Sequence, residues 1–312
     1  ARFQGWQKLK PDSIIGSGTA AALGVSLEDR ITQVRANLER WRLLPKSLGD
    51  KHIFVDLNQQ EMRLFENGQS TLQMKVIAGR DDRRTPTFID QITQVIVNPY
   101  WFAPPRIVVL DILPKAMQDP GYFAQLRMRI FDESGREVDP YYENWGMYTV
   151  DYPPPYTFRE DPGDHNSLGR LKFHLSDNKN SIYMHATNRH DLFAQDKRLL
   201  SSGCVRLENP RDLATALLAS QGYSRASIEG MIYDSTVIAK PIVLTTPVRV
   251  YITGVTVAVD PDGTTRFGQD FYGQDGRIVA AVEGRPVPGS FAETQPEPES
   301  FRPMRQPPWW PF

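Results

Sequence analysis

The chain contains one cysteine, Cys204, which lies 19 residues after a histidine, His185. A thiol beside an imidazole is a common pair for nucleophilic catalysis, because the imidazole can take the thiol proton. The alternative is that Cys204 is a small buried apolar side chain, as many free cysteines are. Gly203 favours the catalytic interpretation, since glycine lets the backbone turn sharply or approach a ligand closely.

The segment after the cysteine predicts a helix over residues 209–218, with Asn209 as its cap and Pro210 at its first position. We therefore expect Cys204 to lie shortly before a helix N-terminus. Free N–H groups and the helix dipole there would lower the pKa of the thiol. The backbone N–H groups of Cys204 and Gly203 are the expected donors to an oxyanion.

His185 and the later run Ser-Ser-Gly-Cys-Val-Arg (residues 201–206) resemble the signature of the L,D-transpeptidase catalytic domain (YkuD-type), a cysteine acyltransferase of bacterial cell walls. Residues 98–101, 166–172 and 30–41 resemble the large periplasmic subgroup of that family, and the resemblance covers most of residues 26–275. Two positions depart from the pattern. The family often has a histidine where this chain has Ser202, and the subgroup often has an acidic residue where it has Ala186.

The resemblance implies a mainly β fold with helices, in which a β-sandwich catalytic domain carries a helical or loop lid. It also implies that Cys204 attacks a tetrapeptide stem of peptidoglycan after its third residue, a diamino acid, and releases D-Ala. The acyl group would pass to an amine of a second stem, forming a 3-3 cross-link. A D-amino acid or an outer-membrane protein are further acceptors. The resemblance implies acylation by carbapenems, a periplasmic location at the cell wall, and no cofactor.

Two alternatives to cross-linking stay open at this stage. With water as acceptor, the same Cys/His site would act as an L,D-carboxypeptidase or as an amidase that cleaves wall anchors. A chain of another class would be a non-catalytic peptidoglycan-binding scaffold. A metal site is not expected, because the other histidines lack the close ligand spacing of zinc sites (His52, His165, His174 and His190).

Five further residues are candidates for binding substrate. Tyr183 lies two residues before His185 on a predicted strand, so both side chains point to one face. Arg206 would turn toward the site and bind a carboxylate if Val205 and Leu207 face inward; the alternative is an ion pair with Glu208. The remaining candidates are Ser202, Trp101 and Asn166.

Composition supports a large folded domain and excludes some partners. The 312 residues carry a formal charge of −1 and are 40% apolar, which is enough for a sizeable core and argues against a basic nucleic-acid-binding surface. No run of about 20 apolar residues exists that would span a membrane. We expect membrane anchoring only through an N-terminal segment missing from this sequence.

The chain divides into four predicted parts. Residues 1–25 resemble part of a helical peptidoglycan-binding module, and residues 26–50 form a helix and linker. Residues 51–275 form the catalytic domain, in which about 100–162 are a substrate-capping insertion whose aromatic residues either shape a groove or pack a local core. Residues 284–312 form a Pro-rich tail.

Three local patterns carry further expectations. The helical stripe of Ile31, Val34, Leu38 and Trp41 predicts packing into a core. The dipeptide Asn67-Gly68 predicts a tight hairpin turn. The charged run over residues 80–84 predicts a solvated loop, and the alternative is a role facing the substrate.

Overall fold

The computed structural model describes residues 1–7, 9–176, 182–259 and 263–287. In that part of the chain, nine strands form one sheet in the order β10-β3-β11-β9-β8-β4-β12-β1-β2. Their bounds are β1 (Lys51–Asp56), β2 (Glu61–Glu66), β3 (Gln69–Gly79), β4 (Phe88–Val97), β8 (Leu171–Leu175), β9 (Met184–His185), β10 (Leu199–Ser201), β11 (Val205–Leu207) and β12 (Lys240–Thr253).

The sheet closes on itself, because β2 also pairs with β3. The hairpin turn between them is at Asn67-Gly68 as predicted, with φ angles of 52° and 78°. The first and last long strands, β1 and β12, are parallel neighbours. The predicted fold class, a β-dominated catalytic domain with helices, is confirmed, with the added finding that strand pairing runs continuously around the core.

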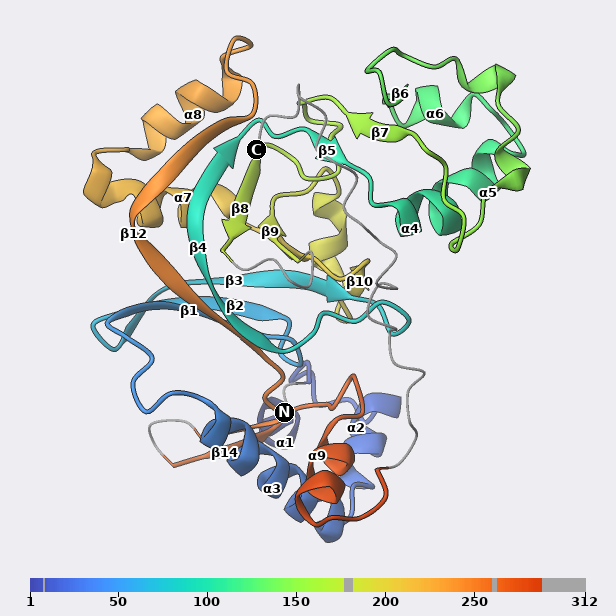
Figure 1. Ribbon diagram of the computed structural model, residues 1–312. Coiled ribbons are helices and arrows are strands. Elements are labelled where there is room, and N and C mark those ends of the chain that lie inside the picture. Colours follow the sequence, from blue (N-terminus) through green and yellow to red (C-terminus); the bar gives the residue numbers. More distant parts are fainter. Residues whose placement is uncertain (8, 177–181, 260–262, 288–312) are drawn as a thin grey trace.

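The closed sheet encloses a core because inward and outward side chains alternate along each strand. In β8, Leu171, Phe173 and Leu175 are buried inside, whereas Lys172 and His174 point outward. Helices α7 (Pro210–Leu218) and α8 (Arg225–Tyr233) pack their apolar side chains into the same core. Figure 1 shows these two helices together beside β12. Two 3-10 turns complete this part, η4 (His190–Ala194) and η5 (Ala219–Gln221).

The predicted insertion is a separate body that extends away from the sheet (Figure 1). It has its own apolar core, in which the ring of Trp145 lies 5.2 Å from that of Phe123 and 5.9 Å from that of Phe158. Trp145 therefore packs a local core. The elements are β5 (Trp101–Phe102), α4 (Pro105–Ile107), η1 (Val108–Ile112), α5 (Leu113–Ala116), α6 (Tyr122–Gln125), β6 (Met128–Phe131), η2 (Pro140–Tyr142), η3 (Trp145–Met147) and β7 (Thr157–Glu160).

The N-terminal helices lie with the last helix below the sheet in Figure 1. Their bounds are α1 (Arg2–Trp6), α2 (Ser17–Leu23) and α3 (Leu27–Leu43). The last helix is α9 (Asp275–Val282), and the strands β13 (Val257–Val259) and β14 (Thr265–Phe267) belong to the same region. Helix α9 was not predicted. Most of the predicted tail lies outside the described residues.

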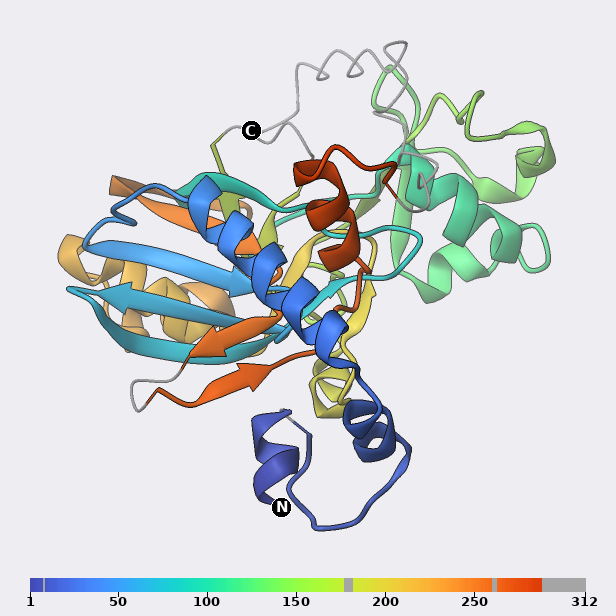
Figure 2. The ribbon, with the colours of Figure 1, turned by 90° about the horizontal axis from the view of Figure 1, so that it is seen from below.

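Helix α3 begins where predicted, with the Ser26 hydroxyl accepting the Asp29 N–H at 3.1 Å. The prediction that its apolar stripe enters a core is wrong, because Ile31 and Leu38 are about half exposed. The buried face is polar: Asn37 bonds to Thr256, and Arg40 forms an ion pair with Asp275 at 2.5 Å. The helix faces α9, with which it shares many contacts, and both appear together in Figure 2.

No helix in the described ranges has both the length and the apolar character needed to cross a membrane.

Candidate active site

Three neighbouring strands present a common outward face on which the predicted catalytic residues meet. His185 on β9 is paired in register with Lys172 on β8 and with Arg206 on β11. Val205 and Leu207 are fully buried inside the sheet, as the prediction for Arg206 required. Cys204 directly precedes β11 and lies two residues before Arg206, so the alternation of side chains directs both to one face.

Tyr183 joins this face and connects it to the insertion. Its ring centroid lies 5.5 Å from that of His185, as expected for residues two apart on an extended segment. Its hydroxyl makes side-chain hydrogen bonds with Cys204 and with Trp101 of the insertion, and burial raises its pKa well above the ordinary value. The structure therefore brings Trp101 to the site through Tyr183.

The turn before β11 fixes the cysteine. Gly203 has φ +118°, and a Cβ on it would lie 3.1 Å from the Ile182 side chain, so the position requires glycine. Thr85 donates its hydroxyl to the Gly203 carbonyl at 2.7 Å. The Ser201 hydroxyl donates to the Cys204 carbonyl at 2.6 Å and accepts the Gly203 N–H at 3.1 Å. That N–H is thus engaged inside the protein, contrary to the oxyanion role expected for it.

The predicted helix is present, but it does not begin at the cysteine. Helix α7 starts at Pro210, and Asn209 occupies the cap position without a side-chain cap bond. The three residues of β11 separate Cys204 from it and span about 10 Å at the usual rise of a strand. The helix dipole weakens beyond the first turn, so it does not lower the pKa of this thiol.

The pKa of the Cys204 thiol is raised, not lowered as predicted, mainly because burial disfavours the thiolate. Hydrogen bonds with Tyr183 and the charges of Lys172 and Arg206 partly oppose that effect. Two cations therefore stand close enough to act on a negative charge formed at the sulfur.

Burial also lowers the pKa of His185, to about 3, and the charge of Arg206 adds to the effect. Hydrogen bonds with the backbone of Ala186 and Leu168 oppose it and hold the ring. The Nδ1 atom is buried and has no hydrogen-bond partner among the described residues, so the backbone bonds involve Nε2. The imidazole is thus neutral near pH 7, and Nδ1 can accept a proton.

Lys172 also faces this site, a position for which the sequence pattern predicts no role by resemblance alone. Its Nζ lies 4.4 Å from the ring centroid of Tyr183, and burial lowers its pKa. The alternation of residues 171–175 would have revealed it, because a lysine on the outward face of a strand beside His185 must share the site.

The charged run over residues 80–84 is not simply a solvated loop. The Arg83 side chain is only 9% exposed and binds the carboxylate of Asp111 in the insertion through two N–H groups, while Arg80 donates to the same carboxylate at 3.1 Å. Arg83 also donates to the Ser202 hydroxyl at 3.2 Å. This loop therefore links the insertion to the residue two before the cysteine.

The structure does not support substrate binding by Asn166 or an ion pair between Arg206 and Glu208. Asn166 is fully buried, and its amide donates to the carbonyls of Pro99, Glu160 and Asp161, so it holds a loop in place. The alternative ion pair of Arg206 with Glu208 does not occur among the described residues. The carboxylate of Glu208 instead accepts a backbone N–H at 3.1 Å.

Within the described ranges, no group of three or more His, Cys, Asp or Glu side chains is arranged to hold a metal ion.

Comparison with known proteins identifies the family. The family model for the L,D-transpeptidase catalytic domain (YkuD) matches residues 50–250, which is well over half of the chain. A Haemophilus influenzae protein assigned to the L,D-transpeptidases is 34% identical over 259 residues, covering 82% of this chain and 51% of that protein. The chain belongs to the L,D-transpeptidase family, which supports a transpeptidase function related to peptidoglycan. It spans about half the length of this curated relative.

Solved structures of L,D-transpeptidases are also similar to this chain at a low level. An Enterococcus faecium L,D-transpeptidase matches with a TM-score of 0.29 and 9% identity, over 66% of this chain and 50% of that one. An L,D-transpeptidase from Mycobacterium smegmatis matches with a TM-score of 0.29 and 10% identity, over 65% and 58% of the two chains. The family assignment rests on the sequence matches.

Proposed function

We propose that this chain is a cysteine L,D-transpeptidase that acts on tetrapeptide stems of peptidoglycan and forms 3-3 cross-links in the periplasm. The observation that carries the proposal is the shared outward face of β8, β9 and β11, where Cys204, His185 and Tyr183 meet two cations. The N-terminal residues 1–25 would help hold the protein at the wall as part of a peptidoglycan-binding module.

The reaction starts from a neutral thiol and a neutral imidazole, as the two pKa shifts require. The sulfur of Cys204 attacks the carbonyl carbon after the third residue of the stem while His185 Nδ1 takes the thiol proton. As the C–N bond breaks, the imidazolium gives this proton to the leaving D-Ala amine, and a thioester forms. The positive charges of Lys172 and Arg206 stabilise the negative charge that develops on sulfur and oxygen.

The second half of the reaction transfers the acyl group to an amine. The acceptor amine attacks the thioester and gives a proton to His185, which returns it to the sulfur as the C–S bond breaks. Attack by water at this step would give a hydrolysed stem instead. The insertion favours transfer because it covers the site through Trp101 and Asp111 and restricts the entry of water.

Incubation with tetrapeptide muropeptides, analysed by mass spectrometry, tests the proposal. The native chain is expected to release D-Ala and form dimers, and Cys204→Ala is expected to do neither while it keeps its melting temperature. A carbapenem is expected to add once to the native chain and not to Cys204→Ser. Dimer formation by the alanine variant would refute the assignment of the nucleophile, and a hydrolysed stem as the sole product would favour a carboxypeptidase.

A further inference from the structure

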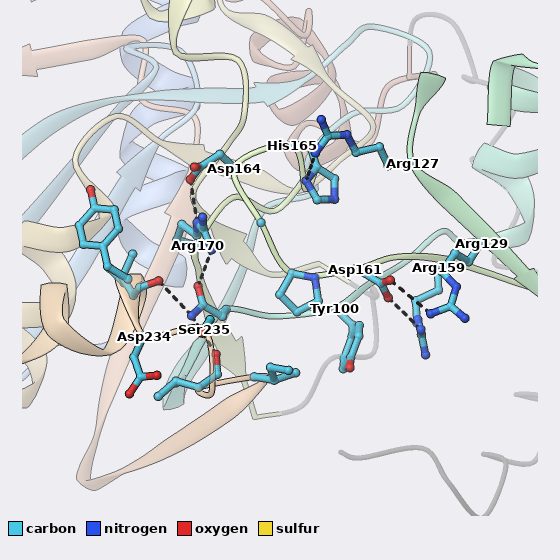
Figure 3. A pocket seen from close by; sticks show the side chains of 17 residues that line it. Tyr100, Arg127, Arg129, Arg159, Asp161, Asp164, His165, Arg170, Asp234 and Ser235 are labelled. Atoms are coloured by element: carbon cyan, nitrogen blue, oxygen red, sulfur yellow. Dashed lines mark hydrogen bonds and ion pairs between the residues drawn. The ribbon is translucent and has the colours of Figure 1, made fainter. Parts of the chain in front are cut away.

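A cavity of about 860 Å³ lies where the insertion joins the closed sheet. Its described lining residues include none of those that we assign to the reaction at Cys204. The wall comes from the segment just after β4, from β6 and β7, from the loop that leads to β8, and from the end of α8 with the residues that follow it. Figure 3 shows these side chains around the opening.

Arginine side chains dominate one side of the cavity. Arg129 binds Glu137 at 2.6 Å and lies 3.4 Å from Asp161, which Arg159 binds at 2.8 Å. Arg170 binds Asp164 at 2.7 Å.

A fourth arginine of the lining, Arg127, is not paired with a carboxylate of the described residues. Its guanidinium instead lies 3.5 Å from Nδ1 of His165 (Figure 3). Burial, followed by the charge of Arg127, lowers the pKa of His165, so the ring is neutral near pH 7 and adds no charge to the cavity. Asp234 also lines the cavity, so its charges nearly balance, and Arg127 is the guanidinium that remains available to an anionic ligand.

The opposite side of the cavity is apolar. Ile232, Val237 and Ile238 line it together with the ring of Tyr233. Such a wall suits a ligand with a hydrocarbon part beside its anionic group, and a bare inorganic anion would leave it unused. A peptide that ends in a carboxylate has both features, and arginine binds carboxylates through paired N–H groups.

We propose that this cavity binds the C-terminal carboxylate of a peptide. If the proposed function holds, that peptide is the second stem, which supplies the acceptor amine.

One loop connects the cavity to the catalytic histidine. Asp164, His165 and Arg170 line the cavity, while the backbone of Leu168 between them holds the His185 ring. A Cβ on Gly169 would lie 2.8 Å from the Ala186 side chain, so this loop packs tightly against the residues around His185. A peptide in the cavity would therefore touch the loop that positions the base.

Binding to a protein whose thiol is blocked tests the proposal without turnover. Cys204 is alkylated with iodoacetamide, and calorimetry measures the binding of a tetrapeptide stem with a free C-terminal carboxylate and of the same peptide as its amide. The carboxylate peptide is expected to bind about tenfold more tightly than the amide, as for one lost charge-assisted hydrogen bond. Arg127→Ala is expected to weaken its binding by a similar factor.

Arg136→Ala is the matched control, because this arginine lies on the same insertion, outside the cavity, with its side chain 83% exposed. It is expected to bind the peptide as the native chain does. Equal binding of the two peptides, or native-like binding by Arg127→Ala, would overturn the proposal. Binding of inorganic phosphate that is lost in Arg127→Ala, without binding of the peptide, would also overturn it in favour of a phosphate ligand.

Kinetics with the unblocked protein separate this proposal from the proposed function. Arg127→Ala is expected to raise the KM for the acceptor about tenfold, with a much smaller change in kcat, because the cavity binds the acceptor and does no chemistry. An equal loss in kcat without a change in KM would contradict the cavity's role. If the native chain forms no acyl-enzyme at all, the proposed function fails, while the binding experiment still decides what the cavity holds.

Discussion

Glu160→Gln should remove a pH-dependent loss of stability that the native chain shows between pH 4.5 and about 7. The Glu160 side chain is buried at the end of β7, where its carboxylate accepts the backbone N–H of Ser167 at 2.6 Å and the Ser167 hydroxyl at 3.1 Å. Burial raises its pKa from 4.5 to about 7. Glutamine keeps the size without the charge: its oxygen can accept the Ser167 N–H, and its amide N–H can donate to the Ser167 hydroxyl oxygen.

The magnitude follows from the linkage between protonation and folding. Below pH 4.5 the carboxyl is protonated in both the folded and the unfolded chain. Between that pH and about 7 the folded chain binds more protons, so the free energy of unfolding falls as pH rises. A shift of this size corresponds to a total fall of about 3 kcal/mol, at 1.36 kcal/mol for each pKa unit.

Urea denaturation of the native chain and of Glu160→Gln, repeated from pH 4 to pH 8, measures this effect. Taking the difference between the two chains at each pH removes the contribution of all other titrating groups. The difference should move by about 3 kcal/mol in favour of the variant as pH rises. Glu137→Gln is a suitable control, because a hydrogen bond from Arg129 lowers the pKa of Glu137. The difference in stability between this variant and the native chain should therefore change with the opposite sign, and at lower pH.

A difference in stability that does not change with pH for Glu160→Gln would refute the conclusion that this carboxyl is held in a poorly hydrated site.

The same substitution should also affect acylation at the proposed active site. Ser167 belongs to the loop whose Leu168 backbone holds His185, so the variant should retain its acylation rate at pH 8 or above better than the native chain does.

Three further predictions concern the cysteine and its surroundings. Asp111→Asn should lower stability by about 1–2 kcal/mol and raise the ratio of hydrolysed to cross-linked muropeptide, whereas the exposed Asp82→Asn should do neither; equal effects would refute the link to the insertion. The rate of alkylation of Cys204 should rise with pH only above the range of an ordinary thiol, and a midpoint at or below about 8.5 would contradict the buried-thiol interpretation. Gly203→Ala should abolish acylation and lower the melting temperature, whereas Gly222→Ala, where a Cβ meets no atom within 4 Å, should only lower it; normal acylation by the first variant would show that the turn tolerates a side chain.

The sequence predicted which candidate residues share a face because that depends on local alternation. Tyr183 and His185 are two residues apart on one extended segment, as are Cys204 and Arg206 on another, so each pair shares a side. The Asn67-Gly68 turn was predicted for a similar reason, since its conformation depends on the two residues themselves.

The features that were missed depend on contacts between distant parts of the chain. The buried face of α3 is decided by Asp275, which lies 235 residues after its partner Arg40. The rise in the pKa of the thiol comes from the surrounding protein, and periodicity contains no information about that burial. The ion pair of Arg83 with Asp111 likewise requires that the insertion folds back over the loop.

The insertion leaves and rejoins the closed sheet through one pair of strands, since Trp101 on β5 is paired in register with Glu160 on β7. Its apolar core is built from its own residues, so little of its folding depends on the sheet. Evolution can therefore exchange or resize this body without shifting the register of the strands that carry the proposed catalytic residues. Relatives that share the closed sheet are expected to diverge most between these two strands, and domain grafting at this junction offers a route to enzymes with altered acceptors.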